Sequence, residues 1–167
     1  FGKQYSREMA FAAPRYTEVR LASVCAEFFG DINKNTVKFV DNYDGELKEP
    51  TLLPVAFPNI LVNSNLGIAV GMASNICSFN LSEVCEATIA YMKNPGCDLL
   101  EYMPAPDFPL GANLIYDRAQ MGEIYKTGRG SFKLRAEYTY DKKNNCIEIT
   151  EIPYTASVEA IIEKLME

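Results

Sequence analysis

Two clusters of proline divide the chain and limit what it can fold into. The clusters are formed by Pro50, Pro54 and Pro58, and by Pro104, Pro106 and Pro109. Proline fixes φ and has no backbone N–H, so neither stretch can lie inside a helix or a central strand. We therefore expect two irregular connectors, with a boundary between subdomains near residue 49.

Helical periods occur on both sides of these connectors. Apolar residues between 17 and 29 recur with a period near 3.6, which predicts a helix that ends at Gly30 and has Tyr16 in or just before its first turn. Asn80, followed three residues later by Glu83, predicts a capped helix through residue 92. Residues 118–125 form a short helix candidate, and residues 157–166 form an amphipathic candidate capped by Ser157.

Period-two alternation predicts the strands. Residues 131–140 and 146–152 alternate around a turn, which predicts a β-hairpin with one buried face. Residues 112–116 form a short strand candidate, and the glycine-rich stretch 59–75 favours strand and loop over helix. The expected fold class is α+β, with antiparallel strands and packed helices.

The composition excludes several classes of function. The chain has no histidine, which removes Ser-His-Asp, Cys-His and most zinc chemistries. There is no G-x-x-x-x-G-K-[ST] loop, so ATP must bind elsewhere, and the acidic turn at 41–45 does not fit a calcium loop. We expect no metal ligand in this chain.

The cysteines and the hydropathy indicate a cytoplasmic protein. The five cysteines show no C-x-x-C pair, and their odd number argues against a closed disulfide framework. No apolar run approaches the roughly 20 residues that span a bilayer, and residues 1–5 lack a signal-peptide pattern. We expect a soluble globular protein that is an excised piece of a longer chain, with no membrane partner.

The distribution of charge is more informative than the net charge of -6. Residues 118–143 carry seven Lys or Arg against three Asp or Glu, residues 1–48 carry seven of each, and the other stretches are acidic. Two surfaces could therefore meet an anion, although ordinary solvated faces would give the same pattern.

Arg15 and Tyr16 are the strongest candidates for chemistry. A phenol, with a pKa of about 10, is a weak nucleophile at neutral pH unless a cation stabilises the phenolate or polarises the phosphate it attacks. Arg15 supplies that cation next door, in a fork geometry suited to a phosphodiester. A structural Arg-Tyr pair on the surface is the alternative.

The sequence around this pair resembles the active-site tyrosine motif of type IIA topoisomerases. Pro14 stands where most bacterial relatives have Met, a mild departure. Further strings follow in the family order: Phe39-Val40-Asp41-Asn42-Tyr43-Asp44-Gly45, Pro58-Asn59-Ile60-Leu61-Val62-Asn63, Gly67-Ile68-Ala69-Val70-Gly71-Met72-Ala73 and Tyr125-Lys126-Thr127-Gly128-Arg129-Gly130. The resemblance covers essentially the whole chain and fits the bacterial A subunits, both of gyrase and of topoisomerase IV.

One departure from the family pattern lies just before the helix expected through residue 92. Relatives commonly read Pro-Pro-His-Asn where this chain has Cys77-Ser78-Phe79-Asn80, so the family histidine is missing. The helix cap through Asn80 is kept, and we infer no loss of cleavage from the change.

The resemblance implies a fold and a reaction. Residues 1–48 would be the end of a winged-helix domain, and residues 49–167 most of a tower domain. Tyr16 would attack a DNA phosphate to give a 5′-phosphotyrosyl end, with Arg15 stabilising the developing charge, during passage of a second duplex.

It also implies partners. They would be double-stranded DNA, a second copy of the A subunit, and the B subunit that carries the ATPase, in an A2B2 assembly. Mg²⁺ and ATP would be held by the B subunit, so this chain alone should not cleave DNA.

Three more residues gain a role through the resemblance. Ile68 matches an aliphatic wedge that enters between base steps and bends the duplex, although plain packing would also explain it. Asn63 matches positions that contact DNA, and Arg129 could approach a phosphate or lie in a solvated turn. A non-catalytic module that bends DNA or serves assembly on the same scaffold is the alternative function.

Overall fold

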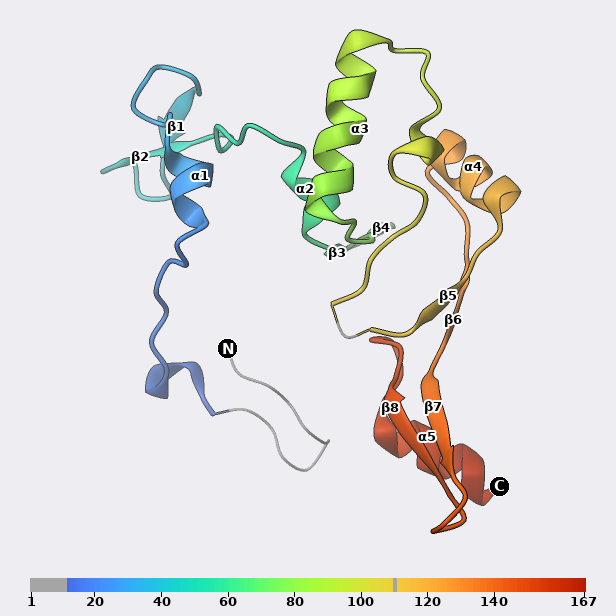
Figure 1. Cartoon of the computed structure of the whole chain (residues 1–167). Helices are drawn as coiled ribbons and strands as arrows, with labels where there is room; N and C mark the ends of the chain where they lie inside the picture. The colour runs from blue at the N-terminus through green and yellow to red at the C-terminus, as the bar shows by residue number, and fades with distance from the viewer. Residues whose placement is uncertain (1–11, 110) are drawn as a thin grey trace. The chain divides into compact units, whose positions relative to one another are not determined.

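The computed structural model describes residues 12–109 and 111–167, which fall into two compact units (Figure 1). The first unit ends at Pro58, and the second runs from Asn59 to Glu167. Each described strand belongs to a two-stranded antiparallel sheet. The expected assignment of residues 1–48 and 49–167 to a winged-helix and a tower domain stays a prediction.

The first unit consists of short elements. These are η1 (Pro14–Tyr16), α1 (Cys25–Phe29), β1 (Phe39–Asp41) and β2 (Lys48–Pro50). Strands β1 and β2 pair with Val40 opposite Glu49, and Thr51 extends the pairing by donating from its N–H to the carbonyl oxygen of Lys38 at 2.9 Å. The rings of Phe28 and Phe57 lie 6.0 Å apart and anchor α1 to the end of the unit.

The expected helix over residues 17–29 is wrong except for its last five residues, which form α1. Thr17 has extended backbone angles (φ -119°, ψ 148°), so Tyr16 lies in a separate 3-10 turn. Val19 and Leu21 are exposed. Because helical stability depends mainly on packing of an amphipathic face, these residues gain nothing from helix formation here. Gly30 follows α1 with right-handed φ and is no left-handed cap.

The second unit contains the longer helices and three antiparallel pairs. Its elements are α2 (Asn59–Val62), β3 (Asn65–Ala69), β4 (Met72–Ile76), α3 (Leu81–Lys93), η2 (Leu99–Glu101), β5 (Asn113–Ile115), α4 (Arg118–Thr127), β6 (Lys133–Arg135), β7 (Glu137–Asp141), β8 (Cys146–Glu151) and α5 (Val158–Met166). The strand-and-loop prediction for 59–75 is confirmed by β3 and β4, while the helical turn α2 was not predicted.

Side-chain caps begin the three main helices, as the sequence predicts for two of them. The Asn80 side chain accepts from the N–H of Ser82 at 2.9 Å and starts α3. Ser157 accepts from the N–H of Ala160 and starts α5. The Asp117 side chain caps α4 in the same way, by accepting from backbone N–H groups of its first turn. The helices predicted over 80–92, 118–125 and 157–166 are confirmed, because each has a local cap as well as a 3.6-residue period.

The core of the second unit lies between α3 and the segment around η2. Val84 and Ala87 of α3 pack with Met103. The Tyr125 ring, from α4, packs edge-on against Phe79 with centroids 6.1 Å apart. Its hydroxyl donates to the carbonyl oxygen of Met103 at 2.6 Å, which ties α4 to this core.

The alternating segment 131–140 forms two strands rather than one. Strand β6 pairs with β5, while β7 pairs with β8 after a register shift at Glu137. The predicted hairpin is confirmed, but its predicted buried face is wrong. Its apolar side chains share one face and are all exposed: Tyr138, Tyr140, Ile147 and Ile149. A two-stranded ribbon has no second layer of its own to cover such a face.

The fold class is thus α+β, with helices and small antiparallel sheets. Within the described ranges, no helix combines the length and the apolar character that crossing a bilayer requires.

Candidate functional site

The Arg15-Tyr16 pair lies in the tight turn η1. Pro14 opens the turn, where its fixed φ suits a helical start and its missing N–H costs nothing. The N–H of Tyr16 donates to the carbonyl oxygen of Ala13 at 3.0 Å. The N–H and hydroxyl of Thr17 both donate to the carbonyl oxygen of Pro14, at 3.2 and 3.0 Å. Local hydrogen bonds therefore hold the backbone conformation at Arg15 and Tyr16.

The turn brings the two candidate side chains together. The Cζ atom of Arg15 lies 5.2 Å from the centroid of the Tyr16 ring, a cation-π distance. The Tyr16 side chain is 74% exposed, so a large substrate can reach its hydroxyl. This arrangement places a permanent cation against an open phenol, as attack on a phosphate diester requires.

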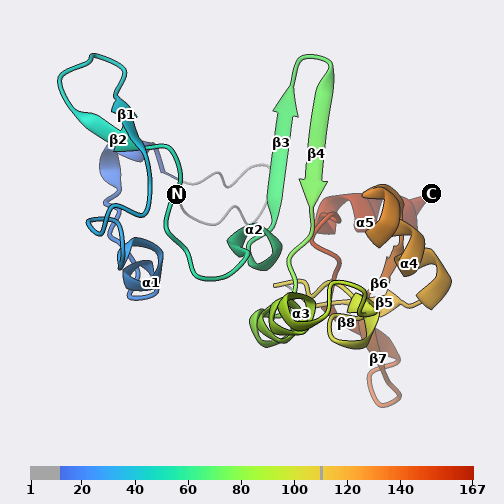
Figure 2. The same cartoon turned by 90° about the horizontal axis from the view of Figure 1, so that it is seen from above.

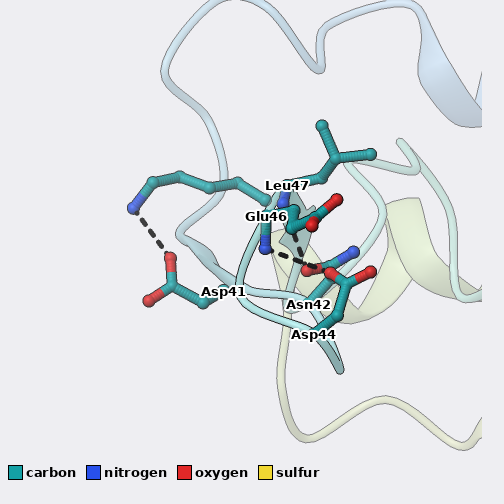
Figure 3. A network of polar contacts seen from close by, with 6 residues as sticks. Asp41, Asn42, Asp44, Glu46 and Leu47 are labelled. Atoms are coloured by element: carbon teal, nitrogen blue, oxygen red, sulfur yellow. Dashed lines mark hydrogen bonds and ion pairs between the residues drawn. The ribbon is translucent and has the colours of Figure 1, made fainter.

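A hydrogen-bonded loop joins β1 and β2 in the same unit (Figure 3). The side chain of Asn42 accepts from the N–H of Leu47 at 3.2 Å, and Asp44 accepts from the N–H of Glu46 at 3.0 Å. Lys48 pairs with Asp41 at 3.2 Å across the strands. The turn chemistry predicted at 41–45 is confirmed, and Tyr43 at its tip is fully exposed.

Ile68 lies on a β-hairpin of the second unit. In Figure 2, β3 and β4 project away from α2 and α3. Ile68 pairs with Ala73 across the hairpin and is 83% exposed. Gly71, with φ of +78°, occupies the turn in a left-handed conformation that favours glycine. Within the described residues of the second unit, Ile68 therefore has no packing role.

Asn63 lies between α2 and the foot of the same hairpin. Its N–H donates to the carbonyl oxygen of Asn59 at 3.0 Å, and its side-chain amide donates to the Asn59 side chain at 2.6 Å. Both bonds close the end of α2, so Asn63 has a structural role here. Its contact with DNA stays a prediction.

Arg129 lies in the turn after α4, and the conformation of Gly128 and the hydrogen bonds of Thr127 determine the shape of this turn. Gly128 ends the helix with φ of +66°, in the left-handed conformation that is common for a glycine C-cap. The Thr127 hydroxyl accepts from the N–H of Arg129 at 3.2 Å and lies 3.0 Å from its carbonyl oxygen. Thr127 was not singled out from the sequence, although a hydroxyl residue just before a Gly-Arg step is a signal for such a turn.

The five predicted site residues thus occupy three local settings. Arg15 and Tyr16 are in direct contact, and Asn63 and Ile68 belong to one segment, at the foot and on a strand of the β3–β4 hairpin. Arg129 is placed by the C-terminus of α4.

One geometric candidate for a metal occurs among the described residues. Ligand atoms of Asp141, Cys146 and Glu148 lie within 4.8 Å of one another at the β7–β8 turn. Hydrogen bonds from the Lys143 N–H and the Asn144 side chain hold the pKa of the Asp141 carboxyl below its ordinary value. The group is exposed and its Asp141 carboxylate already closes the turn, so we assign it no ion.

Comparison with known proteins identifies the family. A family model that describes the A subunit of DNA gyrase/topoisomerase IV matches residues 1–167. The chain is 45% identical over 161 residues to the DNA gyrase A subunit of Mycoplasma genitalium, covering 93% of this chain and 19% of that protein.

Other relatives agree. The DNA gyrase A subunit of Metamycoplasma arthritidis is 48% identical over 162 residues, covering 93% of this chain and 18% of that protein. Its counterpart in Halalkalibacterium halodurans is 45% identical over 163 residues, covering 95% and 19%. The chain therefore spans about a fifth of the length of these relatives. It belongs to the family of A subunits of DNA gyrase and topoisomerase IV.

Proposed function

We propose that this chain is part of the DNA breakage-reunion subunit of a type II topoisomerase, an isomerase, in which Tyr16 is the nucleophile. The observation that carries the proposal is the exposed Tyr16 phenol with the Arg15 guanidinium against its ring. Membership of the family of gyrase and topoisomerase IV A subunits supports the same reaction class.

The proposed reaction is a reversible transesterification. The Tyr16 oxygen attacks a backbone phosphorus, the bond from phosphorus to the 3′ oxygen breaks, and a 5′-phosphotyrosyl link forms. The phenolic proton leaves to solvent or a base, and the departing 3′ oxygen takes up a proton. Religation reverses the ester exchange and the proton transfers. It needs no energy input, because one phosphodiester replaces another.

Arg15 acts on the charge that develops during this exchange. Its guanidinium can donate to the non-bridging phosphate oxygens, which carry more negative charge in the transition state than in the substrate. Its position against the Tyr16 ring keeps the guanidinium close to the phenol that attacks. Arg15 is thus proposed as a catalytic residue rather than as a general DNA contact.

The second unit is proposed to hold and bend the duplex. Ile68 would enter between base steps from the β3–β4 hairpin, where its exposed side chain has the shape and polarity of an apolar wedge. Arg129 would pair with a phosphate from the turn after α4, in the one strongly basic stretch of the sequence. Asn63 would add a polar contact near the foot of the hairpin.

The complete enzyme is proposed to be an A2B2 assembly. ATP and Mg²⁺ would be supplied by the B subunit, as the resemblance to the family implies. Mg²⁺, when bound, would polarise the phosphate that Tyr16 attacks. Double-strand breakage follows because each A subunit cuts one strand.

The test is DNA cleavage by the full-length A subunit with its B subunit, Mg²⁺ and labelled duplex. Tyr16→Phe should abolish cleavage while DNA binding persists. Tyr43→Phe is the matched control, because Tyr43 is an exposed tyrosine of the same unit, and this variant should cleave as the wild type does. Normal binding and bending without cleavage by the wild type would instead support the DNA-bending module.

A further inference from the structure

The β3–β4 hairpin has two faces of different character. Cross-strand pairing puts Leu66, Ile68, Ala73 and Asn75 on one face, which we call the wedge face. Because successive side chains alternate, Met72 lies on the opposite face. Leu66 is 70% exposed and Ile68 is 83% exposed, so two large aliphatic side chains stand side by side in solvent.

The core of the second unit does not cover Leu66. The core of that unit is formed by residues of α3 and the segment around η2, and Leu66 is not among the side chains that pack on it. Two adjacent exposed aliphatic side chains on a projecting ribbon form a small apolar patch, the kind of surface at which a partner binds. We therefore treat the wedge face as a candidate contact surface.

The geometry of the wedge face suits the stacked bases of a duplex. Residues two apart on a strand are separated by roughly 6.7 Å. Base pairs rise by about 3.4 Å along each strand, so this separation corresponds to two base-pair steps. If Ile68 enters one step, Leu66 can reach the bases or sugars about two base pairs away.

The charge of this region is compatible with the same occupant. Residues 59–82 contain no Asp or Glu and no Lys or Arg, so the hairpin is neutral and carries no side chain that would repel phosphates. The hairpin is also narrow, since it consists of two strands with no further strand beside them. A narrow ribbon can bring an apolar side chain to a base step, as the wedges of DNA-bending proteins do.

We propose that Leu66 is a second apolar DNA-contacting residue, which touches the duplex beside the step entered by Ile68 and stabilises the bend there. This inference rests on the proposed function, in that Ile68 is taken as the wedge. Leu66 would widen the apolar contact on one side of the Ile68 step and thereby stabilise the bent form. The contact is neutral, so it should add affinity without adding salt dependence.

The test measures binding and bending of a doubly labelled duplex by the full-length A subunit in complex with its B subunit. Fluorescence energy transfer between the DNA ends reports the bend. Leu66→Ser should weaken binding about tenfold and lower the bent fraction, because an apolar contact is replaced by a polar one. Leu66→Met should restore most of both. The slope of log affinity against log salt should not change.

Met72→Ser is the matched control, since Met72 is 76% exposed on the opposite face of the same hairpin. It should bind and bend DNA as the wild type does. Equal losses for Met72→Ser and Leu66→Ser would overturn the proposal, as they would reflect general damage to the hairpin. Thermal unfolding of each variant checks that the fold is kept.

Ile68→Ala separates this inference from the proposed function. Loss of bending with Ile68→Ala but not with Leu66→Ser would overturn the role of Leu66 and leave the wedge intact. Normal bending with both variants would contradict the wedge itself. Losses with both single variants, and a greater loss in the double variant than in either of them, would support two separate contacts.

Discussion

The guanidinium carbon of Arg15 lies 5.2 Å from the centre of the Tyr16 ring, so the candidate nucleophile and its cation are held as one group. Arg15→Lys keeps the charge but loses the planar fork that can bind two phosphate oxygens. We expect the single-turnover cleavage rate to fall about 10- to 100-fold, with much less change in DNA affinity.

Arg20→Lys is the control for this comparison. Arg20 is exposed on the same stretch of chain and pairs with Glu18 at 3.6 Å. It should cleave at the wild-type rate. An Arg15→Lys enzyme that cleaves as fast as Arg20→Lys would show that Arg15 is only a structural neighbour of the tyrosine.

Thr127 should position Arg129. Thr127→Val removes the hydroxyl that accepts from the Arg129 N–H and leaves the charge of the region unchanged. We expect DNA affinity to fall about threefold, as one modest hydrogen bond no longer orders the turn. Thr127→Ser keeps a hydroxyl and should bind normally. Titration of labelled duplex at fixed salt measures the effect, and equal affinities for the Val and Ser variants would refute it.

The cap of α4 should control local opening of that helix. The Asp117 carboxylate accepts from the N–H groups of Ala119 and Gln120 at 2.9 and 3.2 Å. Asp117→Ala should destabilise the helix by about 1 kcal/mol, which means roughly fivefold faster amide exchange in α4. Asp117→Asn retains an acceptor and should exchange nearly as slowly as the wild type. Exchange followed by mass spectrometry of α4 peptides tests this, and unchanged rates in the alanine variant would contradict it.

Tyr125 should make the second unit sensitive to alkaline pH. Burial, and then the nearby Glu83 carboxylate, raise the pKa of Tyr125 above its ordinary value of 10.0. The folded state therefore keeps the proton when the unfolded state loses it. The free energy of unfolding contributed by this group is intact below pH 10 and falls as the pH rises above it.

Tyr125→Phe tests this dependence. The variant loses the hydrogen bond to Met103, which should cost about 1 kcal/mol at pH ~8. It also lacks the ionisable phenol, so the difference from the wild type should shrink between about pH 8 and about pH 11. Urea unfolding followed by circular dichroism gives the free energy of unfolding of the wild type and of the variant at each pH. A difference between the two proteins that does not depend on pH would contradict the account.

The sequence predicted the parts of the fold that depend on local chemistry. Asn80 and Ser157 were identified as helix caps because a side-chain acceptor followed by an apolar period is typical of a helix start. The turn around Gly45 was predicted from its Asp, Asn and Gly residues, and the β7–β8 hairpin from two alternating segments on either side of a turn. Of the two proline-rich connectors, the described part of the second lacks helix and strand, whereas the first begins within β2, whose last residue is Pro50.

The errors arose where burial decides the outcome. Residues 17–24 have a helical period but no surface to pack against, and the face with Tyr138 and Ile149 alternates correctly yet stays exposed. The break between β6 and β7 depends on which strand pairs with which, and periodicity cannot show this. In the candidate site, adjacency alone did not predict the Arg15-Tyr16 contact, because neighbouring side chains need not point the same way, and the support of Arg129 by Thr127 depends on the turn geometry.

The most direct test of the central claim is to identify the residue that becomes linked to DNA. The full-length A subunit would be mixed with its B subunit, Mg²⁺ and duplex DNA, trapped with denaturant, digested with nuclease and protease, and analysed by mass spectrometry. We predict a nucleotide attached through its 5′ phosphate to Tyr16, absent in Tyr16→Phe. A nucleotide on another residue, or no adduct while DNA is bound and bent, would contradict the assignment of Tyr16 as the nucleophile.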